Sequence, residues 1–174
     1  MEMWDCYTWD RQKLDHQHPR GVPLAQGEYH LVVEIWTVNR RGEILLTQRH
    51  PDKPYGCLWE MSGGSVLAGE TSREGASREL REEVGLMCPP EDLVYIGTVV
   101  RGWSIVDLYR FDHDFDVAAL TLQPKKSLPP RSGRGEFWTP GLQKQIVPHV
   151  SLEFQLTEKR SYPEIRSEFA LKEM

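Results

Sequence analysis

Three glutamates lie close together in the sequence and could bind a metal ion. Glu79, Glu82 and Glu83 fall within Ser72–Val84, a stretch whose apolar residues recur at four-residue steps and predict a helix. Residues three and four positions apart share one face of a helix, so the three carboxylates would lie side by side. Like charges at this spacing are destabilising without a cation, and a set of oxygen ligands favours Mg²⁺ or Mn²⁺ over zinc. The spacing therefore predicts a divalent-metal site.

The residues around these glutamates fit a site that handles phosphate. Glu70 precedes the predicted helix and could join the ligands from a loop, and Arg78 could pair with Glu82 or orient another carboxylate. Glycines ahead of the helix would let the backbone approach a metal or a phosphate closely. Mg²⁺ usually keeps several waters and bridges substrate phosphates, so the residues indicate a metal-assisted phosphate site. The alternative is a solvated acidic face of a helix.

The spacing of this stretch resembles the Nudix signature, G-x5-E-x7-R-E-U-x-E-E-x-G-U, in which U is a bulky aliphatic residue. Every fixed position of the pattern is matched. The matching residues are Gly64, Glu70, Arg78, Glu79, Leu80, Glu82, Glu83, Gly85 and Leu86.

The resemblance implies a fold and an activity. Nudix proteins are α/β/α sandwiches with a mixed β-sheet, and their signature forms a loop–helix–loop that binds Mg²⁺ or Mn²⁺. Their usual reaction is hydrolysis of a nucleoside diphosphate linked to another moiety. The resemblance therefore implies a Mg²⁺-dependent hydrolase that cleaves a phosphoanhydride bond in a small diphosphate-containing metabolite.

The resemblance also implies roles for individual residues. By position, the metal ligands would be Glu79, Glu82, Glu83 and the backbone carbonyl of Gly63. Arg78 would orient the catalytic carboxylates, with Glu70 and Gly64 in supporting positions. A metal-bound water would attack phosphorus in line, and its proton would go to Glu79 or to an acid outside the signature.

Residues upstream of the signature resemble the Nudix subgroup close to isopentenyl-diphosphate isomerase. This resemblance rests on Gly27–His30, Leu45–Arg49 and Leu58–Glu60. The isomerases use a cysteine placed after the tryptophan, but here Glu-Met-Ser-Gly-Gly follows Trp59, and Cys57, expected to be a small buried residue, precedes it. We therefore favour a hydrolase. An isomerase-like enzyme and a non-catalytic Nudix-like binding module remain the alternatives.

The composition of the chain argues against several classes of protein. The chain has 174 residues, which fits one domain, and a net charge of −5, which argues against broad electrostatic binding to nucleic acid. It has no apolar run long enough for a membrane helix, and its first residues show no secretory signal. The three cysteines are far apart and suit a reducing cytoplasm. We expect a cytoplasmic protein with a small-molecule substrate, and the resemblance leaves a homodimer open.

We divide the chain into a polar N-terminal arm, residues 1–28, and a Nudix domain, residues 29–174. The arm is expected to hold one short strand near Trp4–Trp9. The helix is predicted to begin with a capping box of Thr71 and Glu74 and to end at Gly85. Further strands are predicted at Tyr29–Val38, Glu43–Arg49, Leu58–Met61, Val66–Leu67, Leu93–Val100 and Trp103–Phe111, with a Gly-Gly turn between the third and the fourth.

Residues 124–141 are an atypical segment, rich in proline, glycine and basic residues, that predicts an irregular loop. The subgroup would have an acidic, ordered stretch at this position. Codons for Lys-Lys-Ser at residues 125–127, read one base earlier, can spell Glu-Glu-Val. A local frameshift is therefore the alternative to a native loop. Beyond this segment, Ser151–Lys159 and Tyr162–Lys172 are predicted to be helical.

Two further patterns contain metal-ligating residue types. His16-Gln17-His18 is a weak indication of a metal site, and a polar arm is the simpler interpretation. Asp112–Asp116 alternates acids but lacks the glycine and glutamate of a calcium loop, so we interpret it as a solvated strand end.

Overall fold

The computed structural model describes residues 1–121. The predictions for residues 124–141, Ser151–Lys159 and Tyr162–Lys172 lie outside the described residues.

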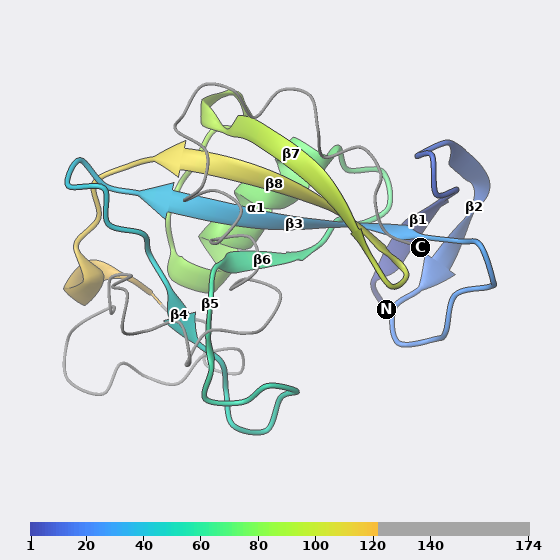
Figure 1. Ribbon diagram of the computed structural model, residues 1–174, viewed down its shortest axis with the longest axis horizontal. Coiled ribbons are helices and arrows are strands. Elements are labelled where there is room, and N and C mark those ends of the chain that lie inside the picture. The colour runs from blue at the N-terminus through green and yellow to red at the C-terminus, as the bar shows by residue number, and fades with distance from the viewer. Residues whose placement is uncertain (122–174) are drawn as a thin grey trace.

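A mixed β-sheet with one covering helix forms the centre of the described chain (Figure 1). The sheet has the order β6-β3-β8-β7, with β6 at Ser62–Ser65, β3 at His30–Val38, β8 at Ser104–Asp112 and β7 at Val94–Arg101. The two central strands β3 and β8 are parallel, and both outer strands are antiparallel to their neighbours. This arrangement confirms the predicted α/β class with a mixed sheet.

Helix α1 spans Ser72–Val84, as the sequence predicts, and lies behind the sheet in Figure 1. Both hydrogen bonds of the capping box form, because Thr71 accepts from the backbone of Glu74 and the Glu74 carboxylate accepts from the backbone of Thr71. Gly85 ends the helix with a φ of 75°, a left-handed conformation that glycine adopts without strain. The local sequence therefore determines both ends of the helix.

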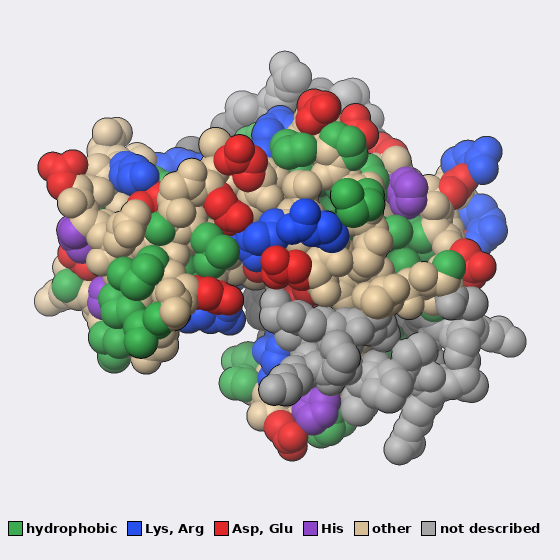
Figure 2. Space-filling view, turned by 180° about the vertical axis from the view of Figure 1, so that it is seen from behind, with side chains coloured by type: hydrophobic (Ala, Val, Ile, Leu, Met, Phe, Trp, Pro, Cys, Tyr) green, Lys and Arg blue, Asp and Glu red, His purple; other side chains and the backbone are tan. Residues whose placement is uncertain are grey.

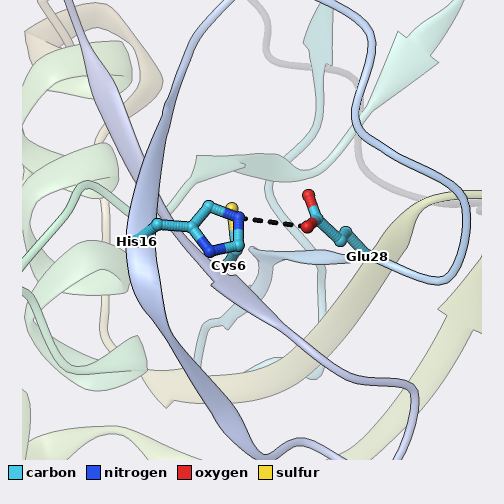
Figure 3. A group of neighbouring side chains, drawn as sticks. All are labelled: Cys6, His16 and Glu28. Atoms are coloured by element: carbon cyan, nitrogen blue, oxygen red, sulfur yellow. Dashed lines mark ion pairs between the residues drawn. The ribbon is translucent and has the colours of Figure 1, made fainter.

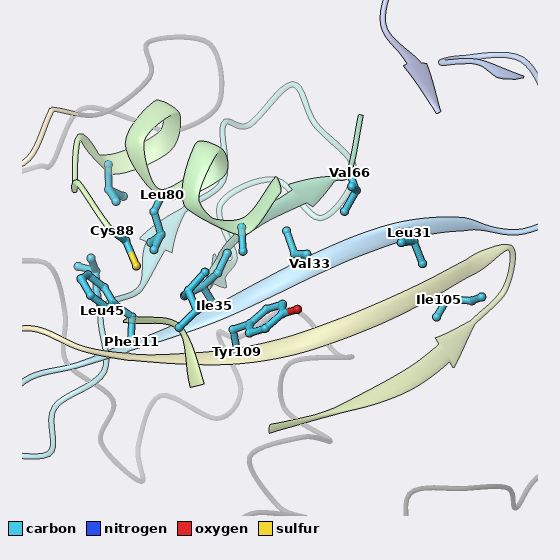
Figure 4. Close-up of a cluster of buried hydrophobic side chains, with 13 residues drawn as sticks. Leu31, Val33, Ile35, Leu45, Val66, Leu80, Cys88, Ile105, Tyr109 and Phe111 are labelled. Carbon is cyan, nitrogen blue, oxygen red and sulfur yellow. The ribbon is translucent and has the colours of Figure 1, made fainter. Parts of the chain in front are cut away.

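One hydrophobic cluster joins α1 to the sheet (Figure 4). Alternate residues of β3 face the helix, and the predicted apolar stripe of Ala76, Leu80 and Val84 is completely buried against them. Burial of each large aliphatic side chain stabilises the fold by about 1.5–3 kcal/mol. The members of the cluster are Leu31, Val33, Ile35, Leu45, Val66, Ala76, Leu80, Val84, Cys88, Leu93, Ile105, Tyr109 and Phe111.

The N-terminal arm is a β-hairpin rather than a polar segment with one strand. β1 covers Met3–Tyr7 and pairs antiparallel with β2 at Lys13–Pro19. Tyr7 and Tyr29 exchange two backbone hydrogen bonds of 2.8 Å, which attach the hairpin to the chain ahead of β3. β2 was missed because its largely exposed, polar residues show no apolar alternation.

Two glycines predicted to form a turn lie inside strand β6 instead. Gly63 pairs with Glu34 of β3, and a Cβ atom at Gly63 would collide with the carbonyl oxygen of Val33. A glycine in this strand permits the close approach of the two backbones. The prediction of a turn was wrong because glycine marks turns and close backbone contacts alike.

The segments between β3 and β6 hold less regular structure than predicted. β4 and β5 are only Thr47–Gln48 and Trp59–Glu60, which pair with each other. Cys57 lies ahead of β5 and is exposed, so its prediction as a buried residue was wrong. Short 3₁₀ turns occur at Pro90–Asp92 and Val117–Ala119.

The acids after β8 form the strand end that the sequence predicts. Asp114 accepts hydrogen bonds from the backbone and the guanidinium of Arg40, in the turn after β3. Within the described residues, no helix is long and apolar enough to cross a membrane.

Candidate active site

Strand β6 and helix α1 bring the signature glutamates together. Glu79 and Glu83 are buried, with 3% and 8% of their surface exposed, whereas the side chain of Glu82 is 39% exposed. The backbone N–H of Gly63 donates to Oε2 of Glu83 over 2.9 Å. The carboxylate of Glu79 packs against Gly64, where a Cβ atom would lie only 2.5 Å from Cδ of Glu79. The strand backbone therefore binds the carboxylate of Glu83 and leaves room for that of Glu79, which could not pack there beside a larger residue than Gly64.

Arg78 connects the loop glutamate with two glutamates of the helix. Its Nε donates to Oε1 of Glu70 over 2.8 Å, and its Nη1 donates to Glu79 over 2.8 Å and to Glu82 over 3.3 Å. Its Nη2 donates to the carbonyl of Ser65 over 2.9 Å. Arg78 thus pairs with Glu82 and orients Glu79, and these were the two roles considered for it in the sequence.

Electrostatics keep this guanidinium charged. Burial disfavours the charged form, but the hydrogen bonds to Glu70 and Glu79 outweigh it and raise the pKa of Arg78. With Glu83, four carboxylates lie in this site around one guanidinium. Seen from behind, the surface of the molecule carries acidic and basic side chains side by side (Figure 2). Several carboxylates therefore lie close together in this site, and such a group is of the kind that binds a hard divalent cation.

A tight loop positions Glu70. Its carboxylate accepts from the N–H of Leu67 over 2.9 Å, and Gly69 adopts a φ of 86°. The N–H of Gly69 donates to Oδ2 of Asp5 over 2.8 Å, so the N-terminal hairpin contacts this loop directly. Burial raises the pKa of Asp5, but hydrogen bonds from Lys13 and Gly69 outweigh it, and the net effect lowers that pKa.

A second charged cluster, which the sequence did not predict, holds the first turn of α1. Asp107 of β8 is completely buried and accepts from both Nη atoms of Arg11, at 2.6 and 2.5 Å. It also accepts from Thr98 over 2.6 Å and from the hydroxyl of Ser72. The only sequence signal is a single acid within the apolar run of β8, since a buried charge requires a partner.

The structure thus brings together every residue predicted for the site. These residues are Gly63, Gly64, Glu70, Arg78, Glu79, Glu82 and Glu83. The available side-chain donors are carboxylate oxygens, which are the ligands that Mg²⁺ and Mn²⁺ prefer. The residues present therefore fit a hard divalent metal.

Comparisons with known proteins point to the same family as the signature. A model of the NUDIX domain matches residues 28–147. An uncharacterised Nudix hydrolase of Listeria monocytogenes is 42% identical over 89 residues, which make up 50% of this chain and 53% of that protein. An RNA pyrophosphohydrolase of Coxiella burnetii is 40% identical over 77 residues, or 43% of this chain and 31% of that protein. The chain spans about half the length of the Listeria relatives it matches.

A solved structure supports the fold. The crystal structure of a protein from Deinococcus radiodurans superposes with a TM-score of 0.63 at 22% identity, and the match covers 92% of this chain and 91% of that one. At this identity the likeness concerns the fold alone.

Proposed function

The chain belongs to the Nudix family, and on this premise we propose that it is a hydrolase that cleaves a phosphoanhydride bond in a small, diphosphate-containing metabolite with the help of Mg²⁺ or Mn²⁺. The observation that carries this proposal is the arrangement around Arg78. One guanidinium holds Glu70, Glu79 and Glu82, while the backbone of β6 holds Glu83. The pyrophosphohydrolase among the relatives supports the reaction type.

Each residue of the site has a proposed task. Glu79, Glu82 and Glu83, with the carbonyl of Gly63, would hold the metal. When bound, the metal would neutralise the diphosphate and lower the pKa of a coordinated water. Arg78 fixes the orientation of Glu79, and Glu70 fixes Arg78 through two hydrogen bonds of 2.8 and 3.1 Å. Such support from outer residues keeps metal ligands in a productive geometry before substrate arrives.

The proposal extends to the rest of the protein. We propose that residues 1–28 form an arm on a Nudix domain that begins at residue 29, and that the substrate is a small molecule rather than nucleic acid. A cytoplasmic location and a homodimer remain proposals from composition and from the family. We also retain the relation to the isomerase-like subgroup as a proposal, although hydrolysis is the favoured reaction because no cysteine follows Trp59 closely.

The experiment that tests this proposal identifies the reaction. The protein is incubated with Mg²⁺ in oxygen-18-labelled water with nucleoside-diphosphate-linked compounds, nucleoside triphosphates and isopentenyl diphosphate, and the products are analysed by mass spectrometry. Hydrolysis places the heavy oxygen on one phosphate product. An isomerised product without label would favour the isomerase-like alternative, and ligand binding without any product would favour the binding module.

A further inference from the structure

A second group of metal-ligating side chains lies away from the signature helix, where the N-terminal hairpin meets the chain ahead of β3. The sulfur of Cys6, a ring nitrogen of His16 and a carboxylate oxygen of Glu28 all lie within 4.8 Å of one another. Nε2 of His16 and Oε1 of Glu28 are 3.1 Å apart. Figure 3 shows the three side chains converging from separate segments of the chain. The sequence drew attention to His16 but gave no indication of its two neighbours.

Backbone pairing explains why these three residues meet. Cys6 belongs to β1 and His16 to β2, and the two strands are paired antiparallel. Tyr7 and Tyr29 exchange two hydrogen bonds as an antiparallel pair, so Cys6 and Glu28, each next to one of them, lie diagonally across this pair on the same face. The cluster therefore joins three segments through strand pairing that exists without any ligand.

The donor set suits zinc better than magnesium. Thiolate, imidazole and carboxylate are the side chains that bind Zn²⁺, and one open position for water completes a tetrahedron. In such a site the ligand atoms lie about 3.3–3.7 Å apart, given metal–ligand bonds of about 2.0–2.3 Å. The contact between His16 and Glu28, at 3.1 Å, would widen slightly on binding, and the other two separations lie within 4.8 Å. Cys6 is completely buried, while the side chain of His16 is 50% exposed, so an ion can enter from the side of His16.

Negatively charged side chains surround the cluster. Burial, followed by the nearby carboxylates of Glu28 and Asp5, raises the pKa of the Cys6 thiol. A cation bound beside these groups would be attracted by both carboxylates and would favour the thiolate that ligates it.

We infer that Cys6, His16 and Glu28 form a binding site for a single Zn²⁺ ion, which links the N-terminal hairpin to the segment ahead of β3. The ion replaces the direct contact between His16 and Glu28 with three metal–ligand bonds. Asp5 of the same hairpin binds the backbone of Gly69, in the loop that carries Glu70. The bound ion therefore also stabilises the contact between the hairpin and this loop. The inference does not depend on the proposed hydrolase activity.

Cobalt provides a direct test because Co²⁺ occupies zinc sites and absorbs in the near ultraviolet when a thiolate ligates it. The full chain, purified without metal, is titrated with Co²⁺ and then with Zn²⁺ as competitor. We expect a sulfur-to-cobalt band that saturates at one ion per chain and disappears when Zn²⁺ is added. Carboxylates of the signature helix cannot produce this band, so the readout is specific for a cysteine ligand.

Matched variants decide which residues bind the ion. Cys6→Ser should abolish the band, and His16→Gln and Glu28→Gln should each weaken binding by about tenfold or more, because each removes one ligand. Cys57→Ser removes the exposed cysteine and His18→Gln removes the other histidine of β2, and both should bind as the wild type does. If Cys6→Ser fails to fold, the two other ligand variants decide the question alone.

The results that overturn the inference are equally definite. A wild-type chain without a thiolate band, a band that is lost in Cys57→Ser, or undiminished binding in both His16→Gln and Glu28→Gln would each exclude the site. Thermal unfolding adds an independent readout, since an ion that binds only the folded state raises Tm. We expect a given Zn²⁺ concentration to raise Tm by the wild-type amount in His18→Gln and by a smaller amount in His16→Gln.

Discussion

The charged clusters around Arg78 and around Asp107 are built in opposite ways. Around Arg78, one guanidinium serves the carboxylates of Glu70, Glu79 and Glu82. Around Asp107, one carboxylate receives hydrogen bonds from Arg11 and from two hydroxyl groups. The first cluster gathers several carboxylates around one guanidinium, and the second places one carboxylate among several donors.

This difference separates a site prepared for a ligand from a structural anchor. A buried carboxylate surrounded by donors is stabilised within the fold and has little to offer a metal ion. Carboxylates that lie close together on one helix face repel one another, and a bound cation relieves this repulsion. The comparison therefore predicts that changes at Arg78 affect mainly activity, and that changes at Asp107 affect mainly stability.

The largest effect is expected from Arg78→Ala. Without the guanidinium, Glu79 loses the hydrogen bond that orients it, and kcat/KM should fall by about 100-fold, as is common when outer support of metal ligands is removed. The rate of metal-dependent hydrolysis measures this effect. Arg81→Ala, on an exposed position of the same helix, is the control and should change the rate only slightly. A rate close to wild type for Arg78→Ala would remove the distinction between the two clusters.

A smaller effect, on stability instead of rate, is expected from Asp107→Asn. The neutral amide leaves Arg11 without its charge partner, and the free energy of unfolding should fall by about 2–3 kcal/mol. Urea unfolding measures this loss, while kcat/KM at a temperature where the variant is folded should stay near wild type. Asp112→Asn, at the exposed end of β8, should change stability by no more than about 0.5 kcal/mol. Equal losses in the two variants would show that Asp107 is not an anchor.

The smallest effect is expected from Thr71→Ala, which removes the cap of α1 next to both clusters. Loss of an N-cap side chain costs about 1 kcal/mol of stability. The affinity for Mn²⁺, measured by electron paramagnetic resonance, should be unchanged, because the helix continues to be held by its apolar face. A large drop in Mn²⁺ affinity would mean that the cap, rather than Arg78, positions the glutamates.

The sequence predicted the features that depend on nearby residues. Both ends of α1 were predicted correctly because the capping box and Gly85 act within one turn of the helix. The predicted site residues meet because four of them lie on that helix and the other three on the segment leading into it.

The features that were missed depend on contacts between distant segments. Arg11 and Asp107 are far apart in the chain, and nothing local identifies one as the partner of the other. The polar strand β2 is held by pairing with β1 rather than by apolar residues of its own. Gly63 and Gly64 were assigned to a turn because the sequence does not show that Val33 and Glu79 pack against them.

The most direct test of the central claim compares Glu83→Gln with Glu91→Gln on the compound that the wild-type protein cleaves fastest in the presence of Mg²⁺. Glu83 accepts the N–H of Gly63 inside the site, and Glu91 is an exposed acid in the 3₁₀ turn after α1. We predict that Glu83→Gln lowers kcat/KM by at least about 100-fold with an unchanged circular dichroism spectrum, and that Glu91→Gln cleaves at the wild-type rate. Wild-type cleavage by a folded Glu83→Gln variant, or no metal-dependent cleavage by the wild-type protein, would contradict the account.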